Sequence, residues 1–239
     1  MQPRIVSDEV QILTDMAMLQ RCAAGLVFLW LVLAHSVAVS AESTSLPRFA
    51  WRKDSSRGDL ESYGVELGGN GRGQVQFKKR NEESITLEVA LKPAAIDNLA
   101  SLFTRADFLN EAKDFVSPRK VADMGAKTVR YDTGLQKREV VYNYTEDKTL
   151  QEITNFFENL CQQERALFEM DLALKYDRLG IPKKLDELER NLSAKRIVAP
   201  ERFTQVLEKI YQDESLMHLA RKEAKKILSR IEKMQAFPN

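Results

Sequence analysis

The chain has 239 residues, with 36 basic and 35 acidic side chains and a formal net charge of +1. This balance creates no strong field for nucleic acid or an anionic membrane, and we expect no nucleic-acid partner. The two cysteines and two histidines form no Cys-x-x-Cys, His-Glu-x-x-His or His-pair motif. We therefore expect no zinc site of the usual kind, no other metal, no cofactor and no catalytic residue set.

The N-terminal part contains an uncharged apolar run of thirteen residues, Cys22 to Ala34. A membrane-spanning helix needs roughly 20 apolar residues, so this run has the length of a signal-peptide core. Arg21 precedes it, and Val39-Ser40-Ala41 supplies the small residues of a cleavage site. The sequence predicts a leader over residues 1–41 and a mature chain that begins at Glu42. The alternative extends the run into a retained anchor over residues 22–41; both alternatives place the remainder outside the cytoplasm.

Residues 1–15 are unusual for a signal because they contain Asp8, Glu9 and Asp15. Translation from Met16 or Met18 would give a compact leader, so we hypothesise that residues 1–15 are not translated. Loss of residues 1–41, with two basic and three acidic side chains, leaves 198 residues with 34 basic and 32 acidic ones. Only Cys161 remains, so an internal disulfide is excluded, and its place on an apolar helical stripe predicts a buried small hydrophobe.

The first half of the mature chain has the alternation of strands. Residues 62–67 and 74–77 flank the Gly-rich stretch GGNGRG, residues 68–73, and predict a hairpin. A two-residue loop at Asn70-Gly71 would put the two apolar faces on opposite sides of the sheet. We therefore expect an odd-length loop or a bulge that pairs Leu67 with Val75 and Val65 with Phe77.

Further along, residues 85–91 alternate as a third strand, and Pro93 opens a helix with an apolar stripe up to Phe103. Residues 110–123 are polar and read as a long loop. Residues 126–131 and 139–144 predict a second hairpin. The sheet is therefore expected to contain two hairpins and a middle strand, with one covering helix, over residues 46–146.

From Lys148 the pattern is helical. A stripe from Leu150 to Leu179 predicts one helix of about 30 residues, about 45 Å long, that ends at Gly180. Three shorter helices follow, around residues 185–192, from Pro200 and from Ser215. Strands first and helices later predict an α+β protein, with the helical region at residues 147–236 packed on the sheet domain.

One triplet, Asp132-Thr133-Gly134, matches the Asp-Thr-Gly of aspartic proteases, in which two carboxylates share a proton. The chain has one copy, so a dimer would be needed. The other interpretation, which we favour, is a hairpin turn in which Asp and Thr bind the local backbone. The single mature histidine, His218, lies near a helix start, where a surface position is expected. GGNGRG lies between two strands and fits no phosphate-loop pattern.

Two basic patches occur, residues 78–80 and a run in the last helix: Arg221, Lys222, Lys225, Lys226 and Arg230. We interpret the run as a solvated helix face, with an acidic envelope partner as the alternative. Phe156 and Phe157 give the long helix a broad apolar stripe, and a further hypothesis is self-association into a homo-oligomer through this helix. Membrane contact is expected only through residues 22–41, if these are not cleaved.

The order of Tyr63-Gly-Val-Glu-Leu, the glycine-turn hairpin, the helix ending in Ala106-Asp107-Phe108-Leu109 and the strand pair at residues 128–142 resembles exported bacterial domains with no assigned activity. The resemblance covers residues 49–157 and implies a small sheet with helices and export, but no catalytic residue. The leading hypothesis is an exported, periplasmic or surface-attached envelope protein that binds a protein partner without catalysis. The alternative is a dimeric hydrolase that uses Asp132.

Overall fold

The computed structural model describes residues 46–55, 57–119 and 121–236. The predicted leader, the cleavage site and Cys22 lie outside these residues. The chain divides into Met1–Thr44 and Ser45–Asn239. The two hydrophobic cores consist of residues between Phe49 and Ile231, all of which belong to the second unit.

The second unit is α+β, as predicted, with a six-stranded antiparallel sheet in the order β4-β3-β2-β1-β5-β6. The strands are β1 (Arg48–Asp54), β2 (Leu60–Gly68), β3 (Arg72–Lys79), β4 (Ser84–Ala90), β5 (Ala126–Asp132) and β6 (Lys137–Tyr142). The sequence analysis did not predict β1. It pairs with both β2 and β5 and thereby joins the two predicted hairpins into one sheet.

The hairpin of β2 and β3 has an odd-length loop, as expected, and keeps the two apolar faces together. The predicted pairing was wrong by two residues, because Val65 faces Val75 and Leu67 faces Gly73. The physical reason is the shortness of the loop, which consists of residues 69–71. Gly71 has φ +80 within it, and a Cβ at Gly73 would lie 1.9 Å from the Glu66 carbonyl oxygen. Glycine at position 73 therefore allows the close approach of the two strands.

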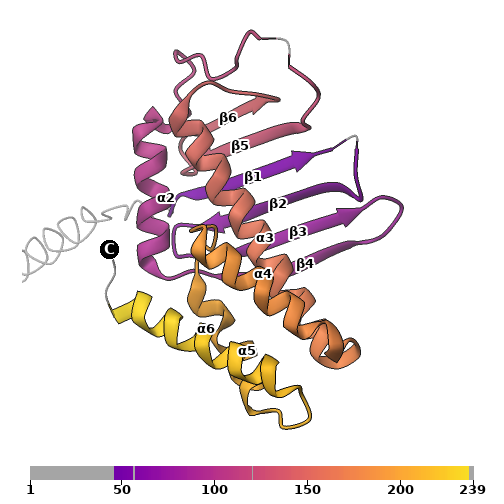
Figure 1. The fold of residues 1–239 in the computed structure, drawn as a ribbon. Helices are drawn as coiled ribbons and strands as arrows, with labels where there is room; N and C mark the ends of the chain where they lie inside the picture. The colour runs from indigo at the N-terminus through magenta and orange to yellow at the C-terminus, as the bar shows by residue number, and fades with distance from the viewer. Residues whose placement is uncertain (1–45, 56, 120, 237–239) are drawn as a thin grey trace, which may run out of the picture. The chain divides into compact units, whose positions relative to one another are not determined.

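Two helices cover one face of the sheet (Figure 1). The predicted helix α2 (Pro93–Arg105) places Phe103 5.0 Å from Phe49, between ring centroids. The long helix α3 (Lys148–Tyr176) crosses the same face and stacks Phe157 on Trp51 at 6.4 Å. A short 3₁₀ turn, η1 (Asp107–Leu109), follows α2. Phe49 and Trp51, which contact α2 and α3, are odd-numbered residues of β1. The even-numbered residues of β1 therefore point away from the helices.

The helical region contains the three predicted shorter helices, α4 (Ile181–Ser193), α5 (Thr204–Gln212) and α6 (His218–Ala236). The 3₁₀ turns η2 (Arg178–Gly180) and η3 (Pro200–Phe203) precede α4 and α5. The long helix has 29 residues and ends at Tyr176, four residues before Gly180. Its first half, up to Cys161, belongs to the core under the sheet, and Met170 and Ala173 belong to the core of the bundle.

Candidate functional site

The face of the sheet opposite α2 and α3 is built from polar and small side chains. Strand alternation and register place these residues in rows across the six strands. One row contains Glu88, Gln74, Glu66, Ala50, Arg130 and Glu139, and the next contains Thr86, Gln76, Gly64, Arg52, Thr128 and Val141. No helix or strand of the described residues covers this face, which we call the open face.

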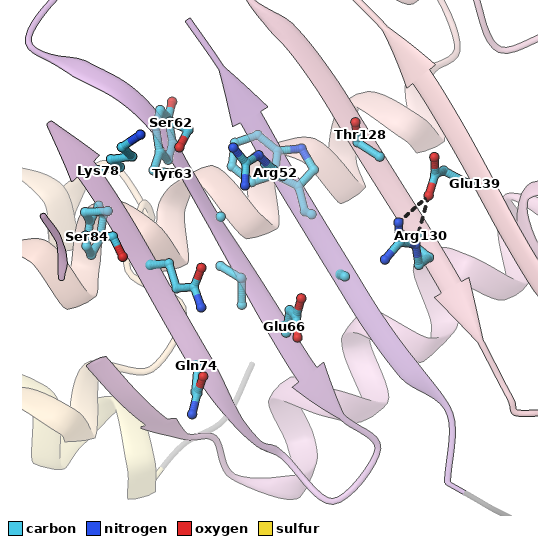
Figure 2. A pocket seen from close by; sticks show the side chains of 16 residues that line it. Arg52, Ser62, Tyr63, Glu66, Gln74, Lys78, Ser84, Thr128, Arg130 and Glu139 are labelled. Atoms are coloured by element: carbon cyan, nitrogen blue, oxygen red, sulfur yellow. Dashed lines mark hydrogen bonds and ion pairs between the residues drawn. The ribbon is translucent and has the colours of Figure 1, made fainter. Parts of the chain in front are cut away.

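The centre of the open face is hollowed, with a cavity volume of about 520 Å³. The hollow lies where the two middle strands carry their smallest side chains, Ala50 on β1 and Gly64 on β2. A Cβ at Gly64 would lie 2.6 Å from the Trp51 carbonyl oxygen, so this position requires glycine. Figure 2 shows Arg52, Glu66, Thr128 and other polar side chains around the hollow. The floor is therefore backbone and small side chains, and the rim is polar.

Most charged groups of the rim are held in ion pairs. Arg130 Nη2 lies 2.6 Å from Glu139 Oε2 across β5 and β6 (Figure 2). Arg52 Nη2 lies 2.7 Å from Asp54 Oδ1, and this hydrogen-bonded carboxylate raises the pKa of Arg52. The remaining contacts join neighbouring strands: Lys78 to Glu61 at 3.0 Å and Gln74 to Glu88 at 2.8 Å. These contacts fix the positions of the long side chains around the hollow.

The open face offers groups that can bind a polar ligand. Its rim contains guanidinium, carboxylate, amide and hydroxyl groups, but neither histidine nor cysteine. Within the described ranges, no cluster of three or more His, Cys, Asp or Glu side chains is arranged to hold a metal ion. Such a surface can exchange hydrogen bonds and ion pairs with a polar ligand.

The structure places Asp132 at the end of β5, in the turn that joins β5 to β6. Its Oδ1 accepts a hydrogen bond from Gly134 N at 2.7 Å, and Thr133 Oγ1 accepts one from Gln136 N at 3.1 Å. Gly134 has φ +84, which favours glycine. These contacts confirm the turn interpretation of Asp-Thr-Gly and direct the Asp132 carboxylate to its own backbone.

Two other singled-out side chains have the predicted surroundings. Cys161 is 1% exposed in the core under the sheet, and burial raises the pKa of its thiol. His218 is exposed at the first residue of α6. The two therefore lie apart from the open face, one in the core and one on the helical bundle.

The Gly-rich stretch and the basic patches form hydrogen bonds and ion pairs with other residues of this chain. GGNGRG is the β2–β3 hairpin, where Asn70 Oδ1 accepts from Arg72 N at 3.0 Å. Lys79 pairs with Glu82 in the turn after β3. On α6, Lys226 pairs with Glu223 at 2.8 Å, and Arg230 pairs with Glu189 of α4 at 2.7 Å. Part of the basic run therefore joins two helices of the bundle.

The broad stripe on α3 is used within this chain. Phe156 and Phe157 are 7% and 0% exposed, respectively, because α3 packs on both α2 and the sheet. The predicted loop at residues 110–123 is also anchored, since Phe115 is buried and Lys113 pairs with Asp147 at 2.8 Å.

Sequence reasoning missed the residues around the hollow. The signal was present in β1, where Phe49 and Trp51 alternate with Ala50 and Arg52, but the strand was not recognised. No protein-family model matches the chain, and a search of curated proteins finds no significant match. Among the described helices, none is long and apolar enough to cross a membrane.

Proposed function

We propose that this protein is an exported cell-envelope protein that binds a protein partner on the open face of its sheet. The observation that carries the proposal is the polar face with a hollow at Ala50 and Gly64, which no described helix or strand covers. The leader pattern at residues 22–41 supports export. The role is binding rather than catalysis, because the hollow contains no convergent nucleophile and base.

A protein is the partner that suits this chemistry. The rim presents both signs of charge close together, as in the pair of Arg130 and Glu139 at 2.6 Å. A polyanion would meet repulsion from Glu66 and Glu139, whereas a protein surface can match both signs. The two central rows carry no aromatic side chain on the open face, so they lack the stacking platform that nucleobases use.

The proposal is tested by replacing Ala50 with a photo-crosslinking benzophenone amino acid in the native host. The matched control is Ala126, another alanine of the open face, which is the first residue of β5 and does not line the hollow. We expect a discrete crosslinked species from position 50 and a much weaker one from position 126. Equal crosslinking at both positions, or none at position 50, would contradict the proposal.

A charge swap tests the role of the rim without removing its internal ion pair. The double variant Arg130→Glu with Glu139→Arg keeps opposite charges on facing positions of β5 and β6. We expect it to fold with unchanged thermal stability and to lose the crosslink from position 50. If the crosslink persists at full strength, the rim does not contact the partner.

A further inference from the structure

A second surface lies at one end of the helical bundle, far along the chain from the open face. Arg178, in the turn after α3, hydrogen-bonds to Ser215 and lies 3.3 Å from Asp213, both in the turn before α6. The two turns are therefore side by side. Figure 1 shows the end of α3 and the turn between α5 and α6 at the same end of the bundle.

Four exposed apolar side chains lie in these two turns or at the helix ends next to them. Tyr176 and Leu179 are 82% and 81% exposed, and Leu219 and Met217 are 66% and 46% exposed. Their neighbours Ala173, Ile181 and Ala220 are buried in the bundle core, so the helices are already packed through other residues. We call Tyr176, Leu179, Met217 and Leu219 the apolar tip.

Each part of the apolar tip has a lysine beside it. Lys175 precedes Tyr176, Lys183 lies one helical turn after Leu179, and Lys222 lies one turn after Leu219. All three lysines are exposed, and within the described part of the chain none of them forms an ion pair.

The acidic groups at this end are largely engaged. Asp177 Oδ1 accepts from Gly180 N at 3.1 Å, and Asp213 is held by Arg178 and Ser215. Glu214, the residue after Asp213, is exposed. With Arg178 and Arg221, which both act on Asp213, the three lysines make five cations against three carboxylates, a local surplus of two positive charges. The total charge of the chain is close to zero.

We propose that the apolar tip binds the surface of an anionic lipid bilayer. Tyr176, Leu179, Met217 and Leu219 enter the interface, and Lys175, Lys183 and Lys222 contact lipid phosphates. Exposed apolar side chains at two adjacent turns, with three lysines close to them in the sequence, match the mixture of hydrocarbon and anionic headgroups at a bilayer surface. This contact goes beyond the partner proposed for the open face and beyond residues 22–41.

A second copy of the chain fits the tip less well. In a two-fold contact the same surface meets itself, so both copies would bring the same three lysines to one interface. Opposed like charges weaken such a contact. Lipid phosphates instead supply negatively charged partners for the three lysines.

The test measures sedimentation of the chain from Glu42 onward with lipid vesicles, because residues 22–41 would themselves bind a bilayer. This chain contains both cores in full. We expect binding to vesicles of phosphatidylglycerol and phosphatidylcholine, weaker binding to phosphatidylcholine alone, and weakening with added salt. No binding to the anionic vesicles would overturn the proposal.

The triple variant Tyr176→Ser, Leu179→Ser, Leu219→Ser should weaken binding at least tenfold, with unchanged thermal stability because all three side chains are exposed. The control is Leu135→Ser, which changes an apolar side chain that is 92% exposed in the β5–β6 turn. Binding that is unchanged in the triple variant, or lowered equally by Leu135→Ser, would overturn the assignment. Light scattering that shows a dimer lost in the triple variant would replace the bilayer with a second copy.

Charge variants distinguish binding through the lysines of the apolar tip from non-specific attraction of the whole chain to an anionic bilayer. Each of Lys175→Gln, Lys183→Gln and Lys222→Gln should weaken binding about fivefold, the usual effect of one lysine near an anionic surface. The matched controls carry the same change at exposed lysines elsewhere: Lys137, Lys148 and Lys233. Equal weakening by both sets would show attraction to the whole chain and overturn the proposal.

Discussion

Arg202 and Glu164 form a bidentate ion pair between η3 and α3. Arg202 Nε donates to Glu164 Oε1 at 2.6 Å and Nη2 to Oε2 at 2.7 Å, and the Glu164 side chain is 2% exposed. The same guanidinium donates to the carbonyl oxygens of Glu88 and Ala90 at 3.3 Å. One side chain thereby joins the long helix, the edge strand β4 and the start of the helical bundle.

Arg202→Met should lower the free energy of unfolding by about 3 kcal/mol, because it leaves the Glu164 carboxylate buried without a cation. Urea denaturation measures the loss. The control is Arg165→Met, which removes the Arg165–Glu169 pair at 2.8 Å, where both partners are exposed. That change should cost about 1 kcal/mol or less. Equal losses in the two variants would show that the buried pair has no special weight.

The α+β class and most helices and strands follow from the periodicity of apolar residues and from residues that mark turns or helix starts, such as Pro93. The pattern of β1 was equally regular, with Phe49 and Trp51 on one face. It was missed because its connection to β2, residues 55–59, has no turn sequence such as the Asn-Gly and Asp-Thr-Gly that marked the two predicted hairpins. Its pairing with β5 bridges 72 residues of chain, from Asp54 to Ala126, and no local signal reports such pairing.

The candidate site was predicted less well than the fold. The hollow depends on Ala50 and Gly64 being neighbours across β1 and β2, which only the register defines. The two-residue error in the β2–β3 register shows how little sequence alone constrains this. In contrast, the Asp132 turn was predicted correctly because its hydrogen bonds reach only two or three residues along the chain.

The predicted leader leads to a direct expectation about processing. Full-length protein with a C-terminal tag, expressed in a bacterium, should be recovered as a soluble exported species that begins at Glu42. Cell fractionation and N-terminal sequencing measure this. A membrane-bound species that retains residues 22–41 would instead establish the anchor. Peptides from residues 1–15 in the native protein would contradict the hypothesis that this stretch is not translated.

Asp132 should matter for the turn and not for hydrolysis. Asp132→Ala removes the acceptor of the Gly134 N–H and should cost about 1 kcal/mol of unfolding free energy. Asp132→Asn keeps an oxygen acceptor and should cost less. Neither variant should change peptide hydrolysis in acid, where the wild type is expected to be inactive. Proteolysis that is present in the wild type and lost in Asp132→Asn would establish the hydrolase alternative.

Tyr142 should make the fold sensitive to alkaline pH. Burial raises the pKa of its hydroxyl from 10.0 to about 12, although the hydrogen bond to Thr154 acts in the opposite direction. The folded state therefore favours neutral Tyr142, whereas the unfolded chain ionises near pH 10. This contribution is present below pH 10 and is lost as the pH rises towards 12. Two pKa units correspond to about 3 kcal/mol, measurable by urea denaturation across this range.

Tyr142→Phe isolates that contribution from its neighbours. Burial and the charge of Lys53 lower the pKa of Lys127, whose ammonium lies 5.7 Å from the Tyr142 ring centroid. A lysine whose folded pKa is lowered makes the fold more stable as pH rises, so Lys127 opposes the effect of Tyr142. The variant should lose about 1 kcal/mol at neutral pH with its hydrogen bond, but much less than the wild type between pH 10 and 12. An identical alkaline loss in both proteins would place the sensitivity at another residue.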